Sequence, residues 1–179
     1  MKNTLLDRLI RYIRTREVIK EIRKGGIVCD LGCDEGHFLM SIRKNISKGY
    51  GFDNKIKERK IDNLYFLNKD INKEINIKAS YITMLAVLEH LDNPQKAINN
   101  SYNTLEKNGK LIITTPSPKA KKVLELLSKL KLIDSHEIED HKKYFNKEEI
   151  YNLLANSRFK DIKIKKFELG LNLLAIAKK

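Results

Sequence analysis

The segment 27–36 (IVCDLGCDEG) constrains the fold of this chain more than any other stretch. Three apolar residues lead to Asp30, a small-residue turn follows, and apolar residues at helical spacing come next. This pattern predicts a buried strand, a tight loop and the start of a helix. Gly32 and Gly36 lack the Cβ atoms that would keep a ligand off the backbone. A helix N-terminus presents unpaired N–H groups, so the segment predicts a site for a nucleotide-like ligand.

Two common phosphate-binding loops do not fit this segment. No Gly-x-x-x-x-Gly-Lys-Ser/Thr run is present, and Asp34 stands where the dinucleotide pattern Gly-x-Gly-x-x-Gly has its middle glycine. A carboxylate there would repel a pyrophosphate, whereas a ligand with an ammonium or sulfonium centre would tolerate Asp30, Asp34 and Glu35. A strand–turn–helix corner without any ligand is the alternative at this point.

Residues 30–36 (DLGCDEG) resemble the first motif of class I S-adenosylmethionine (SAM)-dependent methyltransferases, Asp-x-Gly-x-Gly-x-Gly. The chain departs from that motif at Asp34, where the family mostly has glycine. Aspartate is one of the few residues that accept a left-handed backbone, so the loop can still form. The resemblance implies that SAM is the cofactor and that the loop binds it through Asp30, Gly32, Cys33, Asp34 and Gly36.

Two further acids follow predicted strands in the order of this family. The segment 48–53 reads as a second strand that ends in Asp53, about 20 residues after the glycine loop, where a carboxylate can accept the ribose hydroxyls of a nucleoside. A third strand is expected at 64–67. By resemblance, Asp70 and Ile71 behind it would face the adenine. Acidic surface residues also follow strands at places where no ligand binds, so this alternative stays open for both Asp53 and Asp70.

The segment 81–94 resembles the fourth-strand region of small-molecule methyltransferases, where Leu-Glu-His-Leu-x-x-Pro recurs. The family often begins this strand with an aspartate, and Ala79 and Ser80 occupy that neighbourhood here. The resemblance implies that the backbone around Met84 and Leu85 holds the methionine end of SAM.

Strands alternate with helices over most of the chain, which predicts an α/β fold with a doubly wound, mostly parallel sheet. We expect helices after Gly36, at 94–105, at 118–130 and after Asn146, and a fifth strand at 110–115 after a turn at Asn108-Gly109. The connection 54–63 is short and charged, so any helix there would be stunted. Strands at 159–167 and 172–177 would close a seven-stranded Rossmann-like methyltransferase sheet with an antiparallel terminal strand.

Length and composition fit a single methyltransferase domain over 1–179, with a basic amphipathic helix at 1–23 and a catalytic core at 24–179. No apolar run reaches the roughly 20 residues of a membrane span, and the start of the chain lacks the core of a signal peptide. Cys29 and Cys33 are expected to be free thiols in a reducing compartment. We therefore expect a cytoplasmic protein without a membrane partner.

The net charge of +13 admits two interpretations. It is compatible with a nucleic-acid partner, but the lysines are scattered through most elements and no run of five basic residues occurs. RNA therefore stays open as an alternative to a small-molecule acceptor. The sequence leaves the oligomeric state open.

Histidines are the candidates for proton removal from an acceptor hydroxyl. His90 follows the fourth predicted strand, at the carboxyl edge where open α/β sheets bind ligands, and its ordinary pKa suits a general base. His141 lies in a later loop beside Asp140 and could fold over the same edge. His136 is a weaker candidate, and each histidine could instead have only a structural role.

A metal-dependent site is the alternative to these roles. Some RNA 2′-O-methyltransferases and quinone-biosynthesis O-methyltransferases hold a divalent ion with Glu-x-x-Glu-His, and here Ala86 replaces the first glutamate. Glu89, His90 and His141 could still supply three ligands. With one ligand missing, no metal is expected.

The resemblance as a whole implies an enzyme that transfers a methyl group from SAM to a small-molecule acceptor, preferably at oxygen. An RNA 2′-O-type methyltransferase is the first alternative. The second is a non-catalytic methyltransferase-like subunit, for which Asp34, Ala86 and the missing acid of the fourth strand argue.

Overall fold

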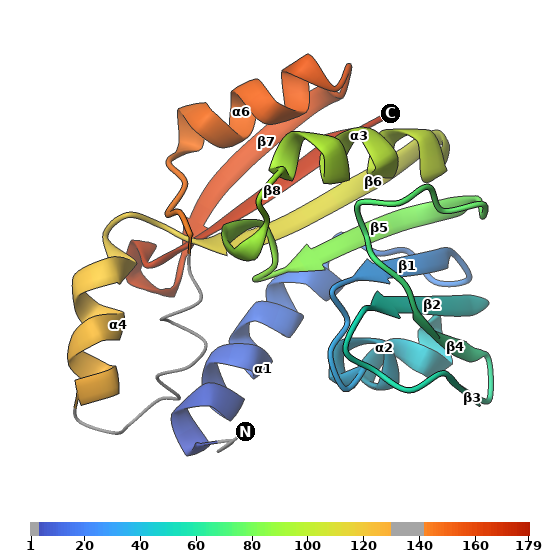
Figure 1. Cartoon of the computed structure of the whole chain (residues 1–179), viewed down its shortest axis with the longest axis horizontal. Helices are drawn as coiled ribbons and strands as arrows, with labels where there is room; N and C mark the ends of the chain where they lie inside the picture. Colours follow the sequence, from blue (N-terminus) through green and yellow to red (C-terminus); the bar gives the residue numbers. More distant parts are fainter. Residues whose placement is uncertain (1–3, 130–141) are drawn as a thin grey trace.

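The computed structural model describes residues 4–129 and 142–179, and within these ranges it forms one eight-stranded sheet with helices on both faces (Figure 1). The strands are β1 (Ile27–Leu31), β2 (Lys48–Asp53), β3 (Arg59–Ile61), β4 (Leu64–Asn68), β5 (Ala79–Leu85), β6 (Leu105–Pro116), β7 (Lys160–Phe167) and β8 (Asn172–Lys178). The described helices are α1 (Leu5–Ile19), α2 (His37–Ile42), α3 (Pro94–Thr104), α4 (Ala120–Lys129) and α6 (Lys147–Asn156). Short 3-10 helices are η1 (Arg43–Asn45), η2 (Leu88–His90) and η3 (Glu168–Gly170).

The strand order is β3-β4-β2-β1-β5-β6-β8-β7. From β4 through β6 neighbouring strands run parallel, whereas β3 is antiparallel to β4 and β8 is antiparallel to β6 and β7. The chain winds outward from β1 to β4 and then crosses to β5 on the other side of β1. The loop after β1 therefore lies where the winding reverses, the usual ligand position in open α/β sheets. The predicted doubly wound, mostly parallel fold is confirmed.

Each face of the sheet carries its own apolar core. Val18 of α1 and Leu39 of α2 belong to one buried cluster, and Ile98 of α3 and Ile150 of α6 belong to the other. Because successive side chains of a strand point to opposite faces, one sheet supplies both clusters. Because helices cover both faces of the sheet, the carboxyl edge of the parallel strands is the part that stays available for a site.

Helix starts follow the expected capping chemistry. Asn146 Oδ1 accepts a hydrogen bond from the Glu149 backbone N–H (2.9 Å), and the Glu149 carboxylate accepts one from the Asn146 backbone (2.9 Å). Thr4 and Asp7 form the same reciprocal box at α1. The helix expected at 118 begins at Ala120 instead, two residues after the proline.

The predicted strand number of seven is wrong, because the described residues form eight strands. The additional strand is β3, which lies in the charged connection 54–63 and pairs antiparallel with β4. A strand of three residues depends on pairing with its neighbour, so local sequence carries little signal for it. The strand expected at 110–115 is also longer: β6 begins at Leu105 and runs through the predicted turn, with Asn108 at φ 65°.

None of the helices in 4–129 and 142–179 has both the length and the apolar composition that crossing a membrane requires.

Candidate functional site

The loop after β1 has the left-handed backbone that its residues predict. Gly32, Asp34 and Gly36 have φ values of 73°, 46° and 81°. Asp34 thus accepts the conformation for which the family uses glycine, as the sequence predicts. Gly36 is the N-cap residue of α2, and it makes no side-chain hydrogen bond to the start of that helix.

The two loop glycines are required by the protein's own packing. A Cβ at Gly32 would lie 2.5 Å from Cγ2 of Val87, and a Cβ at Gly36 would lie 2.2 Å from Cε1 of Phe66. These distances are far below van der Waals contact, so neither position admits a side chain. The sequence predicts these glycines for the approach of a ligand, whereas in the structure Val87 and Phe66 fill the space that a Cβ would take. The loop is therefore held between β4 and the segment after β5.

Asp53 at the end of β2 faces the same loop. Its Oδ2 accepts a hydrogen bond from the Asp34 backbone N–H (3.1 Å), and its Oδ1 accepts one from the Lys55 N–H (2.9 Å). A carboxylate has about four lone-pair positions, so Asp53 keeps acceptor capacity after these two bonds. The predicted proximity of Asp53 and the glycine loop is confirmed by this contact.

Arg59 of β3 also reaches the loop, and sequence reasoning missed it. Its Nη2 donates to the Glu35 carbonyl (2.6 Å), and its guanidinium lies 4.4 Å from the Phe66 ring centroid. The only local signal is an arginine in a charged connection, and its position depends on the pairing of β3 with β4. Arg59 thus ties the edge hairpin to the loop.

Asp30 is buried inside the sheet edge, with 2% of its surface exposed. Thr83 Oγ1 on β5 donates a hydrogen bond to its Oδ1 (2.5 Å). Burial raises the pKa of Asp30 to about 7, the Thr83 hydrogen bond lowers it, and the charge of Asp53 raises it further. The Asp30 carboxyl, which lies under the loop, therefore keeps its proton until the pH approaches its pKa of about 7.

The predicted adenine-side residues follow β4. Asp70 Oδ1 accepts hydrogen bonds from the Asn72 backbone N–H (2.8 Å) and from Asn72 Nδ2 (3.2 Å). Ile71 is buried, and its carbonyl accepts a bond from Asn100 Nδ2 (3.4 Å). Both residues lie at the carboxyl end of the same strand set as Asp53.

The end of β5 brings the other predicted cofactor residues to this edge. Met84 is fully buried and Leu85 is partly exposed. Ala86 has φ 58°, and its N–H donates to the Thr114 carbonyl of β6 (2.9 Å). The chain then turns into η2, which carries Glu89 and His90.

Glu89 is the most strongly buried acid of the site, with none of its surface exposed. Thr115 Oγ1 donates to its Oε2 (3.0 Å). Burial raises the pKa of Glu89 to about 7, while its own backbone N–H, the charge of Arg14 and the Thr115 bond lower it. The sequence singled out this residue only as an alternative metal ligand.

His90 is partly exposed at the end of η2, and its backbone N–H donates to the Val87 carbonyl (3.0 Å). His141 and His136 lie outside the described residues. The next described residue, Lys142, donates its backbone N–H to the Glu89 carbonyl (2.9 Å). The segment that begins there therefore contacts η2.

The two cysteines are free and buried. Burial raises the pKa of both thiols, and the charge of Asp30 raises both pKa values further. A thiol with a raised pKa is a poor nucleophile and a poor metal ligand at neutral pH.

Within the described ranges, no group of three His, Cys, Asp or Glu side chains is close enough to hold a metal ion. The buried Glu89 carboxylate is also engaged by Thr115. The described residues thus do not form a metal site of the kind that Glu-x-x-Glu-His supplies.

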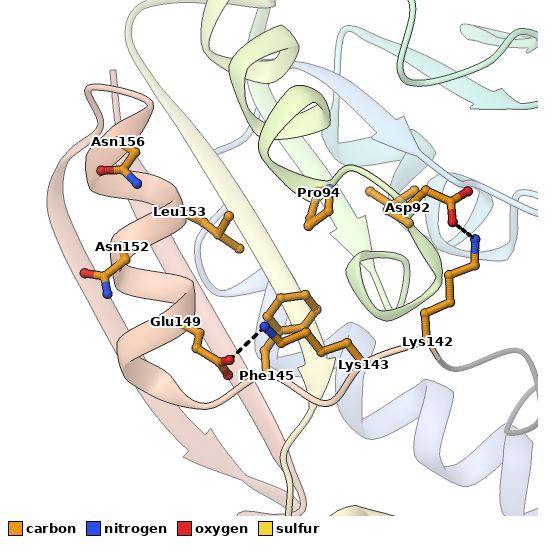
Figure 2. A pocket seen from close by; sticks show the side chains of 10 residues that line it. Asp92, Pro94, Lys142, Lys143, Phe145, Glu149, Asn152, Leu153 and Asn156 are labelled. Carbon is orange, nitrogen blue, oxygen red and sulfur yellow. Dashed lines mark hydrogen bonds and ion pairs between the residues drawn. The ribbon is translucent and has the colours of Figure 1, made fainter.

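A separate cavity of about 590 Å³ lies between the segment after η2, the start of α3 and α6, and Figure 2 shows the residues that line it. Lys142 pairs with Asp92 across one end of it, and Lys143 pairs with Glu149 (2.8 Å). Leu153 and Phe145 supply part of its apolar wall. None of the residues predicted to bind the cofactor lines this cavity, so it is distinct from the edge formed by the glycine loop.

Comparison with known families finds one that is described as "Methyltransferase domain", whose model matches residues 3–164. No curated protein matches the sequence significantly.

Solved structures of similar fold cover nearly the whole chain. A SAM-dependent methyltransferase from Archaeoglobus fulgidus has a TM-score of 0.74 at 18% identity, covering 96% of this chain and 94% of that one. A chain from the complex between the Haloferax volcanii Trm112 methyltransferase activator and a methyltransferase has a TM-score of 0.71 at 15% identity, covering 94% and 90%. Magnesium protoporphyrin IX methyltransferase from Synechocystis PCC 6803 with bound SAH has a TM-score of 0.65 at 15% identity, covering 96% and 82%. At these identities the likeness is one of fold.

Proposed function

The chain belongs to the methyltransferase-domain family, and from that premise we propose that it transfers a methyl group from SAM to a small-molecule acceptor, preferably at oxygen. SAM supplies a methyl group that is already activated on its sulfonium sulfur. The protein then has to align the acceptor with that methyl group and remove a proton if the acceptor is a hydroxyl.

The observation that carries the proposal is the contact between Asp53 and the glycine loop. Asp53 Oδ2 accepts from the Asp34 N–H at 3.1 Å while the carboxylate keeps further acceptor capacity. A carboxylate that holds the loop by one hydrogen bond can still accept hydrogen bonds from hydroxyl groups. Asp53 is therefore suited to bind the ribose of an adenosyl group. Gly32, Cys33, Asp34 and Gly36 would line the cofactor around it.

The remaining cofactor roles are proposed by position. Asp70 and Ile71, after β4, would face the adenine. Met84 and Leu85, at the end of β5, would hold the methionine end. Asp30 would act from beneath the loop, because a cationic sulfonium nearby favours the ionised form of its carboxylate.

His90 or His141 would accept the proton of a hydroxyl acceptor. His90 ends η2, which follows β5 at the carboxyl edge of the sheet, and this location supports its proposed role as the general base. Replacing each histidine with alanine in turn, with the pH–rate profile recorded, would distinguish the two.

Calorimetry with SAM and with S-adenosylhomocysteine (SAH), its demethylated product, tests the proposal directly. Heat of binding from either, at one site per chain, is the expected result, and no heat from both would defeat the enzyme proposal. A screen of candidate acceptors with labelled methyl donor would then identify the acceptor. A parallel assay after thorough chelation tests the metal-dependent variant, which undiminished transfer would remove.

RNA is the second candidate acceptor, and the exposed lysines of the edge strand β7 favour it. Lys160, Lys163, Lys165 and Lys166 all lie on this strand, which has no neighbour on its outer side within the described sheet. Phosphate contacts make RNA binding fall steeply with salt. Binding that is absent or insensitive to salt would count against this candidate.

A non-catalytic partner subunit is the remaining alternative, and the Trm112 complex of a similarly folded protein gives it a precedent. The substitution Asp53→Ala distinguishes a non-catalytic subunit from an enzyme. A structural module should keep its fold and its partner after that change, whereas an enzyme should lose cofactor affinity.

A further inference from the structure

Helix α1 exposes a stripe of large apolar side chains. Leu5, Leu9 and Tyr12 are each more than half exposed. Their spacing of four and then three residues places them on one face of the helix. Val18 of the same helix is fully buried in the core of the protein. The helix has thus buried one side in the fold and presents further apolar surface to the outside, which marks an interaction surface.

Two other elements add exposed apolar side chains. Val123 and Leu126 of α4 are exposed and lie three residues apart, and Leu169 of η3 is fully exposed. Among the described residues, the remaining exposed large apolar side chain is Tyr151 of α6. We call the following residues the apolar end face: Leu5, Leu9, Tyr12, Val123, Leu126 and Leu169.

Direct contacts connect the three elements that carry the apolar end face. Lys165 of β7 pairs with Glu17 of α1 (3.2 Å), and η3 directly follows β7. The Ser117 hydroxyl donates to the Gly170 carbonyl of η3 (2.7 Å), and α4 begins three residues after Ser117. Figure 1 shows α4, the first part of α1 and the turn between β7 and β8 on the left side of the molecule. The face therefore lies at the end of the protein where the parallel strands end.

Leu169 is held in a strained backbone conformation. Its φ is 56°, and that of the preceding Glu168 is 49°. Residues with a Cβ lose free energy in this left-handed region. Because Leu169 is also fully exposed, neither burial nor backbone preference stabilises it there. Strain of this kind at an exposed apolar residue indicates a role in contacts outside the chain.

The charge around the apolar end face is positive. α1 has four arginines and two acids, and α4 has three lysines and one acid. Both acids of α1 are engaged within the chain, because Asp7 closes the capping box and Glu17 pairs with Lys165. Arg8 and Arg16 are exposed next to the apolar stripe. The face therefore complements an anionic surface.

We propose that the apolar end face docks on the surface of an anionic lipid bilayer. Its leucines and Tyr12 enter the boundary between headgroups and acyl chains, and Arg8 and Arg16 pair with lipid phosphates. The Arg16 guanidinium lies 5.8 Å from the Tyr12 ring centroid, so charge and apolar surface are adjacent. Such a contact needs no spanning helix, but it differs from the sequence-based expectation of no membrane partner. It goes beyond the proposed function, because no proposed cofactor residue belongs to the face.

The combination of apolar and cationic groups favours a bilayer over the other occupants. RNA would pair with the arginines but would leave the exposed leucines in water. A second copy that met the same face would bring like charges together. An anionic bilayer accepts the leucines in its acyl boundary and the arginines at its phosphates.

Sedimentation of the full chain with lipid vesicles tests the proposal. Vesicles of phosphatidylcholine mixed with phosphatidylglycerol should bind the protein, and vesicles of phosphatidylcholine alone should bind it about tenfold more weakly. Binding to the mixed vesicles should fall as salt rises. No binding to the mixed vesicles, or equal binding to both kinds, would overturn the proposal.

An introduced tryptophan reports which surface meets the lipid, because the chain has none of its own. Tyr12 and Tyr151 are matched positions, with 58% and 52% of their surfaces exposed. The emission of the Tyr12→Trp variant should shift to shorter wavelength on mixed vesicles, and that of Tyr151→Trp should not. A shift in both variants or in neither contradicts the proposal. A shift of Tyr12→Trp without lipid, together with a dimer in ultracentrifugation, would assign the face to a second copy instead.

Two further variants test the charge and the strained leucine. Arg8→Gln combined with Arg16→Gln should weaken vesicle binding about tenfold or more. Lys44→Gln combined with Lys48→Gln removes the same charge at exposed positions before and at the start of β2, and should weaken it much less. Leu169→Gly should weaken vesicle binding several-fold while raising the urea midpoint, because glycine accepts the left-handed backbone. Unchanged binding in the arginine variant or in Leu169→Gly would overturn the proposal.

SAH calorimetry on the same proteins keeps this inference separate from the proposed function. Every variant should bind SAH as the unmodified chain does, which also shows that it is folded. Vesicle binding by a chain that does not bind SAH would support this inference and defeat the proposed function. SAH binding by a chain that ignores mixed vesicles would do the reverse.

Discussion

Two parts of the same sheet edge satisfy their buried polar groups in different ways. In the loop region, Asp30 accepts from Thr83, and Asp53 accepts from two backbone N–H groups. Around η2 and η3, the buried atoms Glu89 Oε1 and Glu168 Oε1 have no hydrogen-bond partner among the described residues. The acids of the loop region thus have partners within the chain, whereas Glu89 and Glu168 each leave one oxygen unpaired.

Gly36→Ala is expected to break the loop region most severely. The new Cβ would lie 2.2 Å from Phe66 at a φ of 81°, so overpacking and left-handed strain together should cost about 3–5 kcal/mol of unfolding free energy. Gly25→Ala is the matched control, since Gly25 has a φ of 85° but nothing within 4 Å of its Cβ. It should lose only about 1–2 kcal/mol. Equal losses in urea unfolding would show that packing against Phe66 does not matter.

Asp30 should make stability depend on pH. Its pKa is raised from 3.8 in the unfolded chain to about 7 in the fold, so the folded protein holds a proton that the unfolded chain has released. Its contribution to stability is therefore greatest below pH 4 and is lost as pH rises to 7. The slope is about 1.4 kcal/mol per pH unit, or roughly 2.5 kcal/mol between pH 5 and 7.

Asp30→Asn should remove that loss, so the variant gains stability relative to the unmodified chain as pH rises from 5 to 8. Denaturant unfolding at both pH values measures the change. Glu35→Gln removes a neighbouring exposed carboxylate and should preserve the original pH difference. A pH difference unaltered by Asp30→Asn would mean that Asp30 does not hold a proton in the fold.

Asp53→Ala should weaken SAH binding 10- to 100-fold, equivalent to roughly 1.4–2.7 kcal/mol, because the loop loses its brace and the ribose loses its acceptor. Calorimetry measures this affinity. Glu58→Ala removes an exposed acid from the same connection and should not change it. A smaller effect than that of Glu58→Ala would remove Asp53 from the proposed site.

Arg59→Ala should have the smallest effect, about fivefold on SAH affinity, since it removes one bond to the Glu35 carbonyl and the contact with the Phe66 ring. Lys60→Ala is the control on the same strand, because Lys60 contacts the Tyr65 ring instead. The same SAH calorimetry applies. If Lys60→Ala weakens binding as much, the effect comes from the hairpin as a whole and not from Arg59.

Local sequence was sufficient for the loop region because its residues are close in the chain and their conformations are intrinsic. Asp34 and the two glycines predict a left-handed turn wherever the chain places them. Asp53 was placed by the spacing of a parallel strand pair, and its bond to Asp34 bears this out. Arg59 was missed because a three-residue strand acquires its position only by pairing with β4.

The sequence by itself determined the alternation of strands and helices, the backbone of the glycine loop and the family to which the chain belongs. These depend on periodicity and on local conformational preference. Only the tertiary structure decided that Val87 and Phe66 occupy the space beside the glycines, that β3 adds an eighth strand, and that Arg59 reaches the glycine loop. Such contacts join residues far apart in the chain, and their free energy comes from burial and charge that no local segment contains.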